Sequence, residues 1–564
     1  MQKFIKKYPE FSSICLITLL CVLFLFFGLV FYPSLNTTGI MFSSLTANIA
    51  THDNFKNLFL DMQPLLNNSP FYILPITGIV KILNTFNDIN TQILNTFITF
   101  AFVFSTYFMG KHLLSRMYGI VSAILIATSL GYLIFSHTST LTLIFSFLIT
   151  TALYFGFLAI IQDERNKRKK YYCWLFYIFC AFASIIKGLS GLILPFSVIL
   201  IYCFLTKRLK TFFKPKYFLV GLIIFALIDL PWVYQIYNSL GLPFVEKYSY
   251  LPKFELENLK NILYYGKLFL ISFMPWTILF IGFLINVTKN IILRIKNNNG
   301  FNLIKVEQKL NLMTSIYFVV VAIAIILLPV LNYHIILIFP SASFLTASFL
   351  CSADVNEKFK SKIITISTYI LAILFTVILI TFTFLYLFLP ANIFEQSQQI
   401  TNITLIVINL LSILLLLKLK NKNILTTVTS YIVAMILILI FTIVHSTNMF
   451  YYSGENEIIG FSKYAESKDS KLITYNLQVK PRMLINNSDK IYFLQKKDFN
   501  TLKELLKNEE KAYYIILKNK DIQDVTSKLS TELYTLDTGD KYSLLSNINM
   551  PKKSISLSKF YNKY

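Results

Sequence analysis

Two ionisable side chains lie inside apolar stretches of this sequence, where a charge is costly. Asp229 falls in the run IFALIDLPWVY, and Lys187 falls in ASIIKGLSGLILP. Because an ionisable group at such a depth needs a partner or a wet cavity, its default interpretation is functional. Two interpretations of Lys187 stay open. It either forms a structural pair with Asp229 or extends to the membrane surface, or it binds a lipid-linked phosphate while Gly188 lets the chain turn sharply.

Acid–base or metal chemistry requires carboxylates, and the predicted membrane topology limits which carboxylates are candidates. Asp53 and Asp61 are among the acids on the same side of the predicted membrane as Asp229, and we take these three as the candidate catalytic acids. The sequence has no CxxC or Cys/His metal spacing. We assign no cofactor and no metal ligand, and a divalent metal ion stays an open alternative.

Two histidines fall near the same predicted membrane face as these acids. His137 lies in FSHTSTLT and His334 in LNYHIILIFP. Each is either a hydrogen-bonded residue at the interface or a ligand-binding or basic group. We keep both as candidates for substrate binding because they converge on one side.

The elements that must position these residues are membrane spans. The sequence has 55% hydrophobic and only 14% charged residues, which predicts an α-helical polytopic membrane protein. A helix crosses the hydrocarbon core in about 20 apolar residues. We place thirteen spans near residues 13–33, 92–110, 117–135, 141–161, 172–188, 189–205, 217–235, 268–288, 312–330, 335–351, 363–389, 401–417 and 425–445.

Basic residues concentrate in alternate links between these spans, as at residues 165–170, 207–216 and 358–362. The positive-inside rule makes those links cytoplasmic, so the N-terminus is inside and the region after residue 445 is outside. This distribution accounts for the net charge of +24 without nucleic acid. We interpret the first apolar stretch as a retained span rather than a signal peptide.

The outer side carries two kinds of predicted structure. Residues 34–90 contain two apolar helices along the membrane surface, at 41–49 and 70–83, and complete a transmembrane domain of residues 1–445. Residues 446–564 form a small α/β domain with a basic tail at 551–564. We predict strands at 471–477, 490–494 and 512–517, and helices at 499–510 and 521–529.

Four segments, in order, give this chain a resemblance to a known family. They are AFASIIKGLSGLILPFSVILIYCFLTKRLK, LPWVYQIYNSLGLPFVEKY, FMPWTILF and NYHIILIFP. They are similar to motifs of the GT-C glycosyltransferases, in the branch of the lipid A aminoarabinose transferases and the protein O-mannosyltransferase-like enzymes. The resemblance implies that Lys187 and Gly188 bind a polyprenyl-phosphate carrier, and that Trp232 and Tyr333 line the substrate site.

The catalytic motifs of that family are altered here. The Asp-Glu pair that opens the first outer loop falls on Thr38 and Gly39, and an R-x-x-x-x-D element falls on His137 and Thr142. Asp53, Asp61 or Asp229 replaces the missing acid, or the first loop is misaligned, or the protein has lost catalysis. An acceptor that is already an ionised phosphate has less need of a protein base.

The resemblance therefore implies a glycosyltransferase of the bacterial inner membrane. It would move a sugar from a polyprenyl-phosphate carrier to an outer-leaflet, lipid A-like molecule or another envelope acceptor. The alternatives are a catalytically degenerate accessory protein that binds glycolipids, and a transporter or flippase. The expected partners are the lipid-linked sugar, the acceptor and membrane lipids, with no nucleic acid.

Overall fold

The computed structural model describes residues 9–22, 70–83, 89–137, 141–162, 166–212, 214–240, 262–296, 305–327, 332–353, 355–388, 431, 455–467, 471–476, 491–494, 499–506, 513–529, 532–539 and 541–548. Several predictions lie outside these residues. They are the helix at 41–49, the span at 401–417, all of the span at 425–445 except residue 431, the tail at 551–564, and the acids Asp53 and Asp61.

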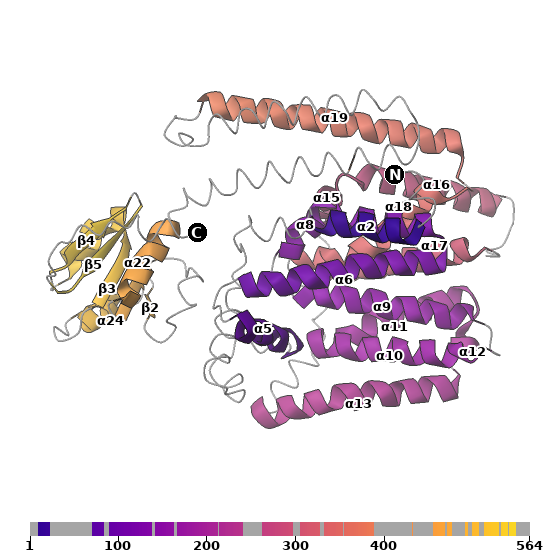
Figure 1. Ribbon diagram of the computed structural model, residues 1–564, viewed down its shortest axis with the longest axis horizontal. Coiled ribbons are helices and arrows are strands. Elements are labelled where there is room, and N and C mark those ends of the chain that lie inside the picture. Colours follow the sequence, from indigo (N-terminus) through magenta and orange to yellow (C-terminus); the bar gives the residue numbers. More distant parts are fainter. Residues whose placement is uncertain are drawn as a thin grey trace.

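Most of the described chain is a bundle of helices lying side by side (Figure 1). Its elements are α2 (Pro9–Cys21), α5 (Pro70–Leu83), α6 (Ile89–Leu113), α7 (Arg116–Ala127), α8 (Leu130–His137), α9 (Leu141–Ile161), α10 (Arg168–Lys187), α11 (Ser190–Leu205), α12 (Leu209–Phe212), α13 (Pro215–Leu240), α15 (Ile262–Ser272), α16 (Thr277–Lys296), α17 (Val306–Leu327), η4 (Asn332–Ile338), α18 (Phe339–Cys351) and α19 (Glu357–Phe388).

Within the described residues, five helices are long and apolar enough to cross a membrane, or six if a bent pair counts as one span. A helix satisfies its own backbone hydrogen bonds, so apolar runs of this length fold as helices in lipid. Of the most apolar window, 72% is buried in α9 but only 17% in α13. The helix α9 is therefore central to the bundle, and α13 lies at its edge.

Two predicted spans differ from the prediction because they are broken. The span at 117–135 consists of α7 and α8, and the span at 268–288 consists of α15 and α16, which are bent by 117°. Polar groups at each break form hydrogen bonds with groups at the other break. The Leu130 N–H donates to the Met274 carbonyl (2.9 Å), and the buried Trp276 indole donates to Thr128 Oγ1 (3.0 Å). Irregular backbone at this depth is tolerated because protein surrounds it.

The span predicted at 335–351 begins as the 3₁₀ helix η4 before it continues as α18. Such helices rarely exceed three or four residues because their hydrogen bonds are poorly aligned. Here three hydroxyls from different helices donate to consecutive carbonyls, which stabilises the longer form. Ser146 of α9 donates to Ile336, Tyr317 of α17 to Leu337, and Ser341 of α18 to Ile338.

The C-terminal residues form a five-stranded sheet with the order β2-β1-β3-β5-β4, in which β2, β1 and β3 are parallel. Both faces of the sheet are covered by helices, so the central strand β3 is buried on both sides. The predicted strands and helices are present, and the prediction missed α22, β4 and β5. The elements are α22 (Glu455–Ser467), β1 (Lys471–Tyr475), β2 (Ile491–Leu494), α24 (Phe499–Leu506), β3 (Tyr513–Lys518), η9 (Asn519–Asp521), α25 (Ile522–Lys528), β4 (Tyr534–Thr538) and β5 (Tyr542–Ser546).

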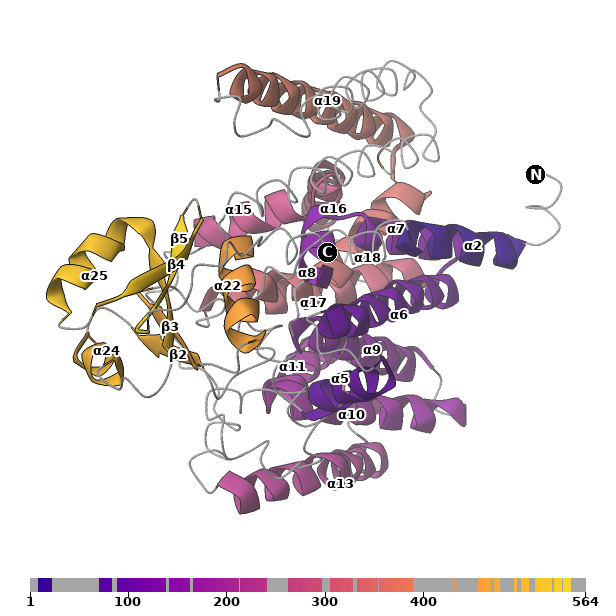
Figure 2. The same cartoon turned by 60° about the vertical axis from the view of Figure 1, so that its left-hand side comes forward.

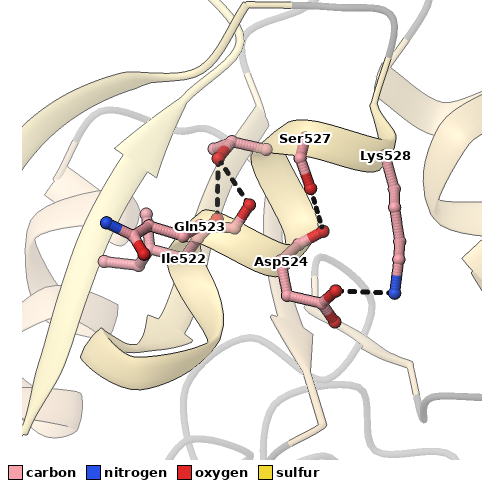
Figure 3. A network of polar contacts seen from close by, with 6 residues as sticks. Ile522, Gln523, Asp524, Ser527 and Lys528 are labelled. Carbon is pink, nitrogen blue, oxygen red and sulfur yellow. Dashed lines mark hydrogen bonds and ion pairs between the residues drawn. The ribbon is translucent and has the colours of Figure 1, made fainter.

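The polar contacts of α25 are local to that helix (Figure 3). Lys528 pairs with Asp524 at 2.6 Å one turn away, and the hydrogen bond that it donates to that carboxylate raises the pKa of Lys528. The Ser527 hydroxyl donates to the Asp524 carbonyl. Because both charged side chains are more than half exposed, this pair supports the helix only weakly.

Candidate functional site

A tight helical hairpin fixes the position of Lys187. Lys187 is the last residue of α10, and only Gly188 and Leu189 separate it from α11. Gly188 has φ 65°, a conformation that glycine adopts without strain. A Cβ on Gly191 would lie 2.2 Å from the Ser184 nitrogen, so the two helices approach closely here. The two glycines therefore hold the lysine at the tip of the hairpin.

The Lys187 ammonium joins three elements. It donates to Thr142 Oγ1 in the first turn of α9 (2.7 Å), and it contacts His334 Nε2 of η4 (2.8 Å). The ring of Phe145 lies 5.5 Å from the ammonium, close enough for a cation–π contact. None of these groups is a carboxylate. Among the described residues, this cation therefore lies among neutral partners, in a small polar cluster that can accept an anion.

The structure does not pair Lys187 with Asp229. Within the described part of the chain, the ammonium forms no ion pair with a carboxylate. Asp229 is 4% exposed on α13, while Leu227 and Leu230 of the same helix are more than half exposed. Asp229 therefore faces the bundle from the edge helix, and Trp232 follows it one turn later, partly buried.

The remaining predicted site residues are only partly described. The backbone of His137 ends α8, and that of Tyr333 lies in η4 beside His334, but their side chains lie outside the described set. Among the side chains that are described, no three His, Cys, Asp or Glu groups come together as a metal site.

An apolar cavity of about 30 Å³ lies away from this cluster. It is lined by α9 residues from Thr150 onward and by Leu310 and Met313 near the start of α17. Thr150 is eight residues from Thr142, which corresponds to about 12 Å along the helix. The cavity therefore belongs to the other half of the bundle, and the polar chemistry lies at Lys187.

The sequence analysis missed Thr142 as a partner of Lys187 and treated it only as the position of a missing acid. One signal was present in the sequence. Thr142, Ser146, Thr150 and Tyr154 follow one another at intervals of four, so they share one face of α9. The structure uses that face to contact Lys187, η4, Tyr317 and His112 in turn.

Comparisons with known proteins identify the fold. No family model and no curated protein sequence matches the chain. The structure of ArnT from Cupriavidus metallidurans bound to undecaprenyl phosphate matches with a TM-score of 0.72 and 12% identity, over 97% of this chain and 99% of that one. Its apo structure also gives a TM-score of 0.72 and 12% identity, over 96% and 98% of the two chains. The chain therefore shares the fold of these ArnT structures over nearly all of its length.

Proposed function

We propose that this protein is a membrane glycosyltransferase that takes a sugar from a polyprenyl-phosphate carrier. The observation that supports this most directly is the cluster around Lys187, in which one ammonium is positioned by Thr142 and His334 at the end of three elements. The similar ArnT structure binds undecaprenyl phosphate. A partly buried cation with neutral partners suits the phosphate of such a carrier.

The role of each residue follows from where negative charge develops during the reaction. An acceptor oxygen attacks the anomeric carbon, the bond from that carbon to the phosphate oxygen breaks, and the configuration inverts. The leaving phosphate gains negative charge in this step, and a positioned ammonium stabilises that charge more strongly than water does. Lys187 has this role in our proposal, and Asp229, Asp53 or Asp61 activates the acceptor.

We further propose that the acceptor is an outer-leaflet lipid of the lipid A type or another envelope glycan, and that the site faces outward from the inner membrane. The neutral surroundings of Lys187 favour an acceptor that is itself anionic, because the described contacts of this cation include no carboxylate to repel it. The same observation supports a second candidate, an accessory protein that binds the lipid-linked sugar without transferring it.

The carrier site is tested by binding of undecaprenyl phosphate to the purified full-length chain. At pH 8, Lys187→Met should abolish binding, because the ammonium is the charged contact for the phosphate, while Lys267→Met should bind normally, because Lys267 is an exposed lysine of α15. Normal binding by Lys187→Met would contradict the proposal.

Transfer is tested by mass spectrometry of lipid A and envelope glycans from cells with and without the gene. A hexose or aminosugar that disappears with the gene identifies both the reaction and the acceptor. Carrier binding without any changed glycan would favour the accessory protein over the enzyme.

A further inference from the structure

While Lys187 is an ammonium, its contact with His334 determines which ring nitrogen carries the proton. A lysine ammonium has three N–H donors and no lone pair, so it can only donate. At 2.8 Å from Lys187 Nζ, the Nε2 atom of His334 must therefore accept. The imidazole is neutral in this arrangement, and its own proton is on Nδ1.

A phosphate at this site would accept the third N–H of the ammonium, beyond the contacts with Thr142 and His334, and would then lie beside the imidazole. Phosphate oxygens are stronger acceptors for a cation than a neutral imidazole nitrogen, because the bond is then charge-assisted at both ends. A protonated Nε2 no longer accepts from Lys187 and instead donates its N–H to the phosphate. An anion beside a histidine favours the protonated ring, whereas the ammonium alone disfavours it.

We propose that His334 is a second arm for the carrier phosphate, which becomes active by taking up a proton when the phosphate binds. The proton comes from solvent to Nε2, and the new N–H donates to a phosphate oxygen opposite Lys187. The inference rests on the proposed function, because it assumes that the phosphate binds at Lys187. It adds that carrier affinity depends on pH through one named residue.

The backbone around His334 is rigid enough for this role. Consecutive carbonyls of η4 accept from Ser146, Tyr317 and Ser341, so the ring is presented from a segment that three helices hold. Lys187 is a charged group in contact with the ring, from α10. The helices packed against η4 carry these other titratable or charged residues: Tyr132 and His137 on α8, Tyr154 on α9, Tyr264, Tyr265 and Lys267 on α15, Glu307, Lys309 and Tyr317 on α17, and Cys351 on α18.

Most of these groups are distant from the ring or engaged elsewhere. Glu307 and Lys309 lie in the first turn of α17, at the opposite end from η4. Tyr132 donates to the Thr99 carbonyl, and Tyr317 donates to Leu337. Lys267 is exposed.

The test measures the affinity of the full-length chain, in lipid nanodiscs, for undecaprenyl phosphate and for its methyl phosphodiester between pH 5.5 and 8. The diester carries one charge throughout this range, so its binding reports the protein alone. Linked uptake of one proton strengthens binding by at most about tenfold for each pH unit of acidification. Wild type should bind the diester at least about fivefold more tightly at pH 5.5 than at pH 8.

Three variants separate this proposal from a structural role. His334→Gln should keep the affinity of wild type at pH 8 within a few-fold and lose the gain at low pH. Thr142→Val should keep the gain, because it removes only a neutral acceptor. Lys187→Met should not bind at pH 8 but should recover weak binding at pH 5.5, where His334 supplies the charge.

Two outcomes would overturn the inference. One is the same pH dependence in His334→Gln as in wild type, and the other is an equal loss of affinity at both pH values in that variant. A wild-type chain that binds neither probe at any pH would contradict the carrier site itself, and the inference with it. Thermal unfolding of each variant confirms that the compared proteins are folded.

Discussion

Lys187 is unusual for a partly buried lysine because the described groups that it contacts are all neutral. Burying a charge without an opposite charge is costly, and here only a hydroxyl, an imidazole and an aromatic face compensate for that cost. An incoming anion stabilises such a lysine more than it would stabilise a lysine already paired with a carboxylate, since no existing salt bridge has to be broken. The position of the lysine is thus better suited to binding than to structural support.

Asp229 is the acid whose removal best tests catalysis, because it is the candidate that the structure describes. We predict that Asp229→Asn lowers sugar transfer by roughly a hundredfold if it activates the acceptor, since positioned bases contribute at least that much. The measurement is the transfer rate from an undecaprenyl-phosphate sugar to the acceptor found by mass spectrometry. Carrier binding by the same variant is the control and should not change. An unchanged rate would assign the role to Asp53 or Asp61.

Part of the candidate site could be predicted from the sequence. Lys187, Asp229 and His334 stood out because polar groups are rare in apolar runs, and the structure places two of them in contact. Their contact could not be predicted, because 147 residues separate Lys187 from His334. The expected alternative of a pair with Asp229 had the same sequence support, and only the packing of α10 against η4 distinguishes the two.

The element that controls His334 is η4, and its anchor is Tyr317. We predict that Tyr317→Phe destabilises the protein by about 1 kcal/mol, because the Leu337 carbonyl loses its donor. It should also weaken carrier binding several-fold at pH 5.5, because η4 presents His334. Thermal unfolding and undecaprenyl phosphate binding measure the two effects.

Tyr118→Phe is the matched control for this prediction. Tyr118 is also buried and donates to a backbone carbonyl, that of Phe344, but within a regular helix away from η4. It should lose similar stability and keep carrier binding. Equal losses of binding in both variants would remove the special role of η4.

The breaks in the two spans stabilise each other, because groups at one break form hydrogen bonds with groups at the other. We predict that Trp276→Phe and Thr128→Val are not additive, with a coupling of about 0.5–1.7 kcal/mol in a double-mutant cycle of unfolding in detergent. Both changes remove the same hydrogen bond, so the second should cost little after the first. Additive losses would show that the bond contributes no stability.

Apolar length predicted where the helices lie because hydrocarbon leaves the backbone no other way to satisfy its polar groups. It could not predict the breaks, because Thr128 and Ser129 interrupt α7 and α8 within a run that stays apolar on average. A break is stable only when another segment supplies partners, as Met274 and Trp276 do here. These partner residues lie about 145 residues further along the chain.

At the scale of the whole molecule, the sheet lies beyond the same end of the bundle as α5 in both views (Figures 1 and 2). The helix α5 directly precedes α6, and α6 and α9 run in the same direction because α7 and α8 return between them. The beginning of α9 and the end of α10, with Lys187, are therefore at the end of the bundle that the sheet adjoins.

We predict that Lys187 and the sheet face the same compartment. In a chain without native cysteines, Ser190→Cys and Lys520→Cys should react with a membrane-impermeant maleimide added outside the cell. Lys167→Cys, at the basic end of α10, should react only after permeabilisation. Labelling of residues 190 and 520 from opposite sides would contradict both the topology and the proposed function.

The short turn between α10 and α11 also constrains how the chain is made. With two residues between them, we expect the helices to enter the bilayer as one hairpin, whose leading tip in the predicted topology carries Lys187. Moving one ammonium through hydrocarbon costs about 2.5–3.5 kcal/mol, which the apolar residues of both helices offset. Each additional lysine at the tip would add a similar cost. Biogenesis therefore limits this tip to few positive charges, while the trailing end can accumulate Arg168 and Lys170 freely.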